Sequence, residues 1–176
     1  MVDDTQLIRQ IKAGKTEALD ELIQKYYSDI YTYCYRRIGS EADAQDITQE
    51  VFLHFCRNFD SYTHRGKCKN YLYVIARNLC INTIQKKTPV SLEEVWDEML
   101  PGTDVVESKI EMANSVEPAL NALPDGQKEV ILLRFYHDLK LKDIADIMGE
   151  NLSTTKYRLN QGLKRLGELL NREDWL

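Results

Sequence analysis

The sequence predicts an all-α protein: two small helical domains joined by a flexible acidic linker, the second of them a helix-turn-helix domain. Apolar residues recur with the helical period of 3.6 through most of the 176 residues. Residues 88–115 break the pattern with Pro89 and Pro101, and they hold seven acidic residues against one basic residue, a linker composition. Near the end, a helix, a four-residue turn containing Gly149 and a second helix follow in helix-turn-helix order. The predicted boundaries are 1–87, 88–115 and 116–176.

The first domain is predicted to hold four helices, over residues 5–13, 17–37, 41–58 and 70–87. Thr16 and Ser40 are placed to cap the second and third helices, because a side-chain oxygen at that position accepts a hydrogen bond from a free backbone N–H. Gly39 is placed to end the second helix, and Pro89 the fourth. A polar loop, residues 59–69, separates the third and fourth helices.

The second domain is predicted to hold four more helices, over residues 115–122, 123–136, 140–148 and 153–170. On the helical wheel of the last one, a single side carries a leucine stripe that we expect to face the core: Leu159, Leu163, Leu166 and Leu170. Within the linker, a turn of helix is expected after Ser91 and another after Thr103.

The net charge of −5, with a pI near 5.3, argues at first against a nucleic-acid partner, because phosphate binding needs a basic surface. The distribution of the charge removes that objection. The first domain sums to +2, the linker to −6 and the second domain to −1. Two stretches are strongly basic, since residues 57–87 carry +6 and residues 151–166 carry +4 with no acidic residue. Both stretches are candidate nucleic-acid surfaces.

Other classes of protein fit less well. No stretch reaches the ~20 apolar residues that span a bilayer, and the N-terminus lacks the order of a signal peptide, so we expect a cytoplasmic chain without membrane insertion. The four cysteines and three histidines match no zinc spacing, so no metal is expected and the thiols are interpreted as reduced core groups. Cys68 falls in the predicted loop, where an inert thiol and an oxidant sensor are both open. No Gly-rich phosphate loop or GxSxG turn occurs, so neither an enzyme nor a cofactor is expected.

The last predicted helix has the polar face of a DNA-reading helix. Its side around Thr154, within about 60°, lies opposite the leucine stripe and carries Tyr157, Arg158, Gln161 and Arg165, with Lys164 at the margin. The first residues of such a helix contact base edges in the major groove, and its cations contact phosphates. The predicted contact residues are Ser153, Thr154, Thr155, Lys156, Tyr157, Arg158, Gln161, Lys164 and Arg165. A solvated amphipathic helix is the alternative.

The other basic stretch interleaves cations with aromatic rings, at Phe59, Tyr62, Tyr71 and Tyr73. Cations beside rings suit unpaired nucleotides. In the fourth helix, three amide side chains lie within about 40° of Tyr71, at Asn78, Asn82 and Gln85. Amides can hydrogen-bond to exposed base edges. An ordinary polar helix face with half-buried tyrosines is the alternative.

Three segments in order resemble extracytoplasmic-function (ECF) sigma factors of bacterial RNA polymerase. Residues 43–53 read DAQDITQEVFL and resemble the segment that docks on the polymerase clamp, while residues 71–78, YLYVIARN, resemble the promoter-melting helix. Leu-Pro at 123–124, LKDIADIMG at 141–149 and STTKYRL at 153–159 resemble the second domain of these factors. Order, spacing and length agree, so the resemblance spans nearly the whole chain.

The resemblance implies an alternative sigma factor, without catalytic activity, that binds core RNA polymerase and directs promoter-specific transcription initiation. The first domain is expected to melt and read the −10 element and the second to recognise the −35 element of promoter DNA; an anti-sigma factor is a further candidate partner. Tyr62 and Asn78 match residues that hold a flipped −10 base. The predicted −10 contacts are Tyr62, Arg65, Lys67, Tyr71, Arg77, Asn78, Asn82, Gln85 and Lys86. The predicted polymerase contacts are Asp43, Asp46, Gln49, Glu50 and Phe52.

An autonomous helix-turn-helix transcriptional regulator is the alternative function. Such regulators usually dimerise to match two half-sites, and the sequence offers no long heptad repeat or strand pair as a dimer interface. The linker suggests a further hypothesis for a sigma factor. Its charge of −6 would let it occupy a basic nucleic-acid channel of polymerase until emerging RNA displaces it.

Overall fold

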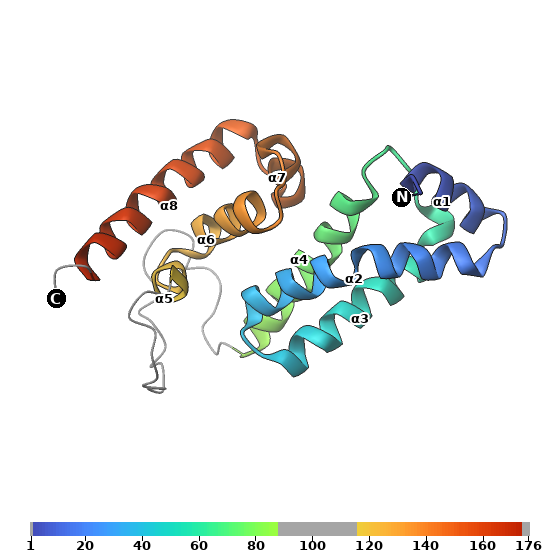
Figure 1. Ribbon diagram of the computed structural model, residues 1–176, viewed down its shortest axis with the longest axis horizontal. Coiled ribbons are helices and arrows are strands. Elements are labelled where there is room, and N and C mark those ends of the chain that lie inside the picture. The colour runs from blue at the N-terminus through green and yellow to red at the C-terminus, as the bar shows by residue number, and fades with distance from the viewer. Residues whose placement is uncertain (1, 88–115, 174–176) are drawn as a thin grey trace. The chain divides into compact units, whose positions relative to one another are not determined.

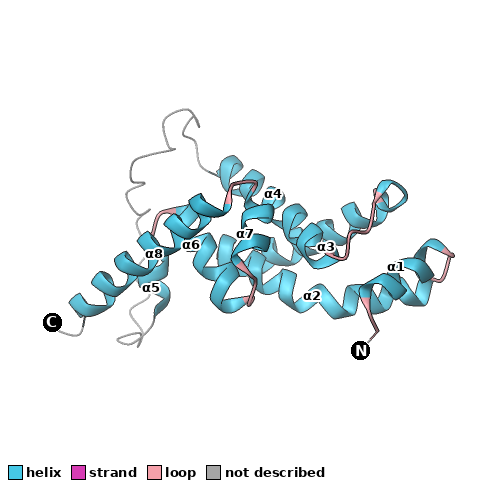
Figure 2. Ribbon diagram, turned by 90° about the horizontal axis from the view of Figure 1, so that it is seen from above, coloured by secondary structure: helices cyan, strands magenta, loops and turns pink. Residues whose placement is uncertain are grey.

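The computed structural model describes residues 2–87 and 116–173, and the chain divides into two compact units, which we take one at a time (Figure 1). Within these ranges the regular elements are helices and no strand occurs (Figure 2). The prediction of an all-α fold is confirmed. The predicted linker, residues 88–115, with its two expected turns of helix, lies outside the described residues.

The first unit contains α1 (Asp4–Lys12), α2 (Thr16–Ile38), α3 (Glu41–Arg57), the 3-10 turn η1 (Phe59–Ser61) and α4 (Cys68–Lys87). The long helix α2 packs against α1, α3 and α4, and α3 also packs against α4, as Figure 1 shows. The three long helices fill the core with side chains that are fully buried: Leu22, Ile30, Tyr33, Val51, Phe55, Leu72 and Tyr73. Tyr33 of α2 meets Tyr73 of α4 edge to face, with ring centroids 5.4 Å apart.

Of the four predicted helix-end residues, two act as expected, and Pro89 lies outside the described residues. Gly39 ends α2 in the left-handed conformation, with φ of 77°, where a residue without a Cβ is favoured. The Oγ of Ser40 accepts a hydrogen bond from the backbone N–H of Asp43 at 3.3 Å. The prediction for Thr16 is wrong, because Lys15 takes the cap position and Thr16 is already the first helical residue. Gly14, with φ of 85°, turns the chain two residues before Thr16, where α2 begins.

The second unit contains α5 (Val116–Asn121), α6 (Asp125–Ile131), the π-helical turn η3 (Leu132–Tyr136), α7 (Leu141–Met148) and α8 (Leu152–Glu173). The helix predicted over residues 123–136 is therefore α6 continued by η3. Both α5 and α6 pack on α8. Gly162 permits the close approach of α6, because a Cβ at this position would lie 2.9 Å from Cδ1 of Ile131 and 3.2 Å from Cβ of Gln127.

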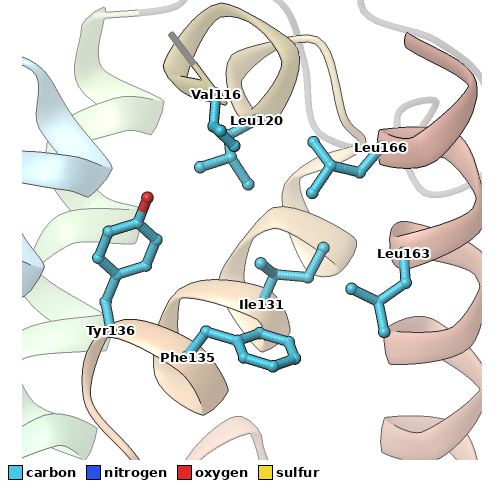
Figure 3. A pocket seen from close by; sticks show the side chains of 7 residues that line it. All are labelled: Val116, Leu120, Ile131, Phe135, Tyr136, Leu163 and Leu166. Carbon is cyan, nitrogen blue, oxygen red and sulfur yellow. The ribbon is translucent and has the colours of Figure 1, made fainter. Parts of the chain in front are cut away.

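The leucine stripe of α8 is only partly a core stripe. Leu159 is buried, but Leu163 is 39% exposed, and the other two are half-buried. Figure 3 shows Leu163 and Leu166 lining an open pocket of about 300 Å³, with five further side chains: Val116, Leu120, Ile131, Phe135 and Tyr136. The leucine stripe extends beyond the helices that cover it, because α8 has 22 residues, whereas α5 has six and α6 has seven.

Candidate nucleic-acid interface

The loop between α3 and α4 places the ring of Tyr62 against the ring of Tyr71. Their centroids lie 4.9 Å apart, and the ring planes are tilted by 32°. Phe55 packs behind both rings, with centroids 5.5 Å from Tyr62 and 6.1 Å from Tyr71. Phe55 is fully buried, whereas the two tyrosines are half-buried. The core therefore fixes the inner edges of an aromatic surface that remains open to a ligand.

The hydroxyl of Tyr62 is held inside this loop. It lies 3.1 Å from Nδ1 of His64. Burial is the main cause that raises the pKa of Tyr62 well above its usual range, and the negative charge of Cys68 in its thiolate form adds to this effect. The phenol therefore stays neutral, and its hydrogen bonds serve to orient the ring.

Cys68 is a core residue and does not belong to the loop. Its side chain is fully buried, and burial, followed by the charge of Asp4, raises the pKa of the thiol to about 12. The helix begins at this residue, two positions earlier than the sequence predicts. Of the two alternatives for Cys68, this burial favours the inert thiol, since a reactive thiol must be accessible and ionised. Cys34 and Cys80 are also buried, whereas Cys56 is exposed.

The fourth helix carries exposed amides in line with Tyr71. Asn78, Asn82 and Gln85 are exposed, and the helical repeat places Asn78 two turns, ~10 Å, beyond Tyr71 on the same face. The opposite side of α4 faces the core, where Tyr73 and Cys80 are fully buried. The ring and the three amides thus form one outward stripe, as the wheel predicts.

Basic side chains accompany this stripe. Arg65 and Lys67 of the loop and Lys86 of α4 are exposed, and Arg77 is half-buried. All nine predicted −10 contacts therefore lie on one loop and one helix, in a segment of high positive charge. Among these nine residues, the structure brings the rings of Tyr62 and Tyr71 into direct contact.

Four of the five predicted docking residues of α3 are at least partly exposed. Asp46 and Gln49 are exposed. Asp43 forms an ion pair with Lys87, and this hydrogen bond, aided by Ser40, lowers the pKa of its carboxyl group. Glu50 pairs with Arg57 at 3.0 Å while both side chains stay well exposed, so this pair contributes little to stability.

The fifth predicted docking residue, Phe52, is buried in this structure. Its side chain is only 5% exposed and stacks on Tyr27 of α2, with centroids 6.0 Å apart. Tyr27 is 36% exposed and presents the outer aromatic ring at this position. The sequence could not reveal this pairing because the two residues are 25 positions apart and lie on different helices.

The turn between α7 and α8 has the predicted helix-turn-helix form. Gly149 adopts φ of 66° after α7 ends. Asn151 caps α8, since its Oδ1 accepts a hydrogen bond from the backbone N–H of Thr154 at 2.8 Å. The start of α8 is therefore fixed by the side chain that immediately precedes it.

Thr155, one of the predicted −35 contacts, is turned inward in this structure. Its side chain is fully buried. The hydroxyl lies 2.9 Å from Oε1 of Glu150, to which it donates, and 3.2 Å from the carbonyl oxygen of Asn151. Thr155 therefore ties the first turn of α8 to the preceding turn.

Arg158 is turned toward its own domain. Its Nε lies 3.2 Å from Oε2 of Glu150, and the side chain is 34% exposed. Its guanidinium covers Gly126, where a Cβ would lie 2.0 Å from Nη1. The acid-free stretch counted from the sequence begins one residue after Glu150, so sequence reasoning missed the carboxylate that holds Arg158.

The other predicted −35 contacts are accessible. Ser153, Lys156, Lys164 and Arg165 are exposed, Thr154 and Gln161 are half-buried, and Tyr157 is 63% exposed. The surface of α8 that DNA can reach therefore combines three cations with a large exposed ring.

Two features are absent from the residue ranges that the structure describes. No helix in them is long and apolar enough to cross a membrane. No group of three or more His, Cys, Asp or Glu side chains in them could hold a metal ion.

Both units match known protein families. Residues 22–89 match Sigma-70 region 2, and residues 114–166 match Sigma-70, region 4. The chain is 32% identical to the ECF RNA polymerase sigma factor SigW of Bacillus subtilis (strain 168), over 93% of this chain and 94% of that protein. It is also 32% identical to the ECF RNA polymerase sigma factor BldN of Streptomyces coelicolor, over 92% of this chain and 64% of that protein.

Solved structures share the fold. CnrH in complex with the cytosolic domain of CnrY aligns with a TM-score of 0.71 at 18% identity, over 96% of this chain and 97% of that one. The sigma factor RpoE in complex with the anti-sigma factor NepR, from Bartonella quintana, aligns with a TM-score of 0.67 at 22% identity, over 86% and 96%. With a region 2, a region 4 and full-length similarity to such factors, the chain belongs to the ECF family of RNA polymerase sigma factors.

Proposed function

We propose that this sigma factor binds core RNA polymerase and directs promoter-specific transcription initiation in the cytoplasm, without catalytic activity of its own. Its first unit melts and reads the −10 element, and its second unit recognises the −35 element. Polymerase supplies most of the non-specific affinity for DNA, while the sigma factor supplies register and sequence. An anti-sigma factor is a further proposed partner, as the family membership suggests.

The contact between Tyr62 and Tyr71, above the amide stripe of α4, carries the proposal for the −10 element. Taking a base out of the stack costs a few kcal/mol. Stacking on an aromatic ring returns ~1–3 kcal/mol per base. The extruded base stacks on the surface that the two rings form. The amide of Asn78 hydrogen-bonds to the exposed edge of this base, so the strand stays open once polymerase has bound.

The proposal for the −35 element rests on the accessible face of α8. Ser153 and Lys156 lie in its first turns, where a recognition helix contacts base edges. Lys164 and Arg165 lie further along and neutralise phosphates. Tyr157 adds an exposed ring between these two groups. Thr155, whose hydroxyl donates to Glu150, supports this surface from beneath.

The docking surface on polymerase is proposed to centre on Asp46 and Gln49 of α3, because both side chains are exposed. Glu50 is within reach of the same surface through its well-exposed carboxylate. Tyr27 replaces Phe52 as the aromatic member. Asp43, held by Lys87, marks the edge of this surface.

The first experiment is transcription in vitro by core polymerase with and without this chain. Permanganate footprinting then compares melting by holoenzymes that carry the wild-type chain, Asn78→Ala or Asn160→Ala. Asn160 is an exposed amide on α8 outside the proposed contacts, so it serves as the matched control. We expect Asn78→Ala to bind polymerase normally and to melt the −10 element poorly. Normal melting by Asn78→Ala contradicts the base-capture site.

Promoter-duplex binding without polymerase and gel filtration distinguish a sigma factor from an autonomous regulator. A regulator of that kind binds a promoter duplex without polymerase and elutes as a dimer from gel filtration. A sigma factor elutes as a monomer, and its promoter binding depends on polymerase. Tight polymerase-independent binding by a dimer would contradict the proposed function.

A further inference from the structure

Helix α1 precedes the segment that matches Sigma-70 region 2, which begins at residue 22. Two of its side chains nevertheless reach the loop that carries Tyr62. The Oγ1 of Thr5 lies 3.3 Å from Nε2 of His64. The Nζ of Lys12 donates to the carbonyl oxygen of Tyr62 at 3.4 Å. These two contacts join residues that are 59 and 50 positions apart in the sequence.

The helix that makes these contacts is itself firmly anchored. Leu7 is fully buried and Ile8 is 3% exposed. Asp4, at the first turn, forms an ion pair with Lys25 of α2 at 2.6 Å and accepts a hydrogen bond from the hydroxyl of Tyr26 at 2.5 Å. A helix held by its apolar face and by a half-buried ion pair can act as a fixed support.

The contacts continue from α1 to the proposed base-stacking surface. His64 bonds Thr5 through Nε2 and the Tyr62 hydroxyl through Nδ1, so a single imidazole ring joins α1 to the stacking ring. The ring of Tyr62 then contacts Tyr71. Lys12 holds the backbone of the same tyrosine. Both the ring and the peptide of Tyr62 are therefore tied to α1.

Stacking and base reading place different demands on this site. Stacking on a ring tolerates every base, because each base has a π-face. Discrimination needs hydrogen-bonding groups at defined positions along the base edge. The loop that follows Tyr62 supplies such a group in Arg65, which is exposed, while half-buried His64 holds the loop through both ring nitrogens. Its position therefore affects selectivity more than it affects stacking.

We propose that α1 is a positioning element for the −10 site, in which Thr5, through His64, and Lys12, through the Tyr62 carbonyl, fix the loop that decides which base is accepted. The inference rests on the proposed capture of an unpaired −10 base at Tyr62. Thr5 and Lys12 are positioning residues and do not touch the base.

The test uses holoenzyme and a promoter library randomised across the −10 element. Transcripts are sequenced, and the base preference at each position is compared between wild type, Thr5→Val and Lys12→Met. Matched controls are Thr16→Val and Lys15→Met, which alter the same residue types at exposed positions around the start of α2. We expect Thr5→Val and Lys12→Met to lower the preference for the favoured base by roughly three- to tenfold, the effect of losing one hydrogen bond. The controls should keep the wild-type profile.

A conservative variant separates positioning from a general effect on folding. Thr5→Ser keeps a hydroxyl within reach of His64, so it should keep the wild-type base profile, whereas Thr5→Val loses it. Thr5→Val in a His64→Ala background should change nothing more, because the contact is already absent. An unchanged profile in Thr5→Val and Lys12→Met overturns the proposal. So does a uniform loss of transcription with an unchanged profile, since that result assigns α1 a stabilising role alone.

The failure of this inference is distinguishable from the failure of the proposed function. If Asn78→Ala and Tyr62→Ala melt promoters normally, base capture itself is wrong. If those two variants lose melting while the α1 variants keep the wild-type base profile, base capture stands and only the role of α1 is wrong.

Discussion

Glu150 and Arg158 form an ion pair between the turn and the last helix, with Oε2 and Nε 3.2 Å apart. The other carboxylate oxygen of Glu150 accepts the hydroxyl of Thr155 at 2.9 Å. Only 13% of the Glu150 side chain is exposed. One acidic residue therefore engages two residues of α8 that the sequence assigns to DNA, and it decides how much positive charge the helix offers.

Replacing Glu150 with Gln tests this control of charge. The amide oxygen can still accept from Thr155, while the loss of the negative charge frees Arg158 to reach a phosphate. We expect tighter binding of holoenzyme to the promoter and a salt dependence steeper by about one phosphate contact. Because Arg158 is a third exposed, the unfolding free energy should fall by only about 1 kcal/mol. Titrations at several salt concentrations check the slope, and an unchanged slope contradicts the prediction.

Arg158→Ala should weaken −35 binding for a different reason than direct contact. Its removal leaves the Glu150 carboxylate unpaired beside the DNA phosphates, which it repels. We expect a loss of roughly three- to tenfold in affinity for the promoter. In a Glu150→Gln background the same substitution should cost less, because no unpaired carboxylate remains. Equal losses in both backgrounds would show that Arg158 acts independently of Glu150.

The sequence predicts the helices of this protein well because their signals are local. Ser40 and Gly39 act within one turn of the helix ends that they mark, and the apolar period of α2 and α3 extends over several turns. The outward stripe of α4 follows from the helical repeat alone. Such features depend on neighbours within about four residues, which a single sequence displays.

The side chains whose burial the sequence does not predict are covered through contacts with other helices and turns. Phe52 is covered by Tyr27 from another helix, and a wheel diagram does not show which helix lies against which face. Thr155 sits at the start of α8, but its hydroxyl turns to Glu150. For Cys68, a two-residue shift in the start of α4 moves the thiol from the loop to the core. The support of Tyr62 by α1 has no local signal at all.

Thiol labelling tests the position of Cys68. The thiolate is the reactive form, and a pKa of about 12 lowers its population about a thousandfold relative to an ordinary thiol near 9 at the same pH. At pH 8.5 we expect iodoacetamide to modify exposed Cys56 and to leave Cys68 unmodified in the folded protein. In urea all four thiols should react. Mass spectrometry of peptides reads the result, and labelling of native Cys68 at the rate of Cys56 contradicts its burial.

Two glycines of α8 provide a matched test of the packing between α6 and α8. A Cβ at Gly162 would crowd Ile131 and Gln127, whereas a Cβ at Gly167 would meet nothing within 4 Å. Alanine is favoured over glycine in a helix by about 1 kcal/mol at either position, and overpacking at Gly162 opposes that gain. Gly162→Ala should therefore be less stable than Gly167→Ala by about 1–2 kcal/mol in urea unfolding of the second unit's signal. Equal stabilities would contradict the close packing.

The acidic linker gives the last prediction, which the sequence alone supports. If its charge of −6 holds it in a basic channel of polymerase, then neutralising Glu93, Glu94, Asp97 and Glu98 weakens that attachment. Emerging RNA then displaces the linker more easily, so we expect a lower ratio of abortive to full-length transcripts. The control neutralises four exposed acids elsewhere: Glu17, Asp20, Glu21 and Glu168. Because the total charge changes equally in both variants, the same abortive ratio in both would contradict a role that depends on the linker.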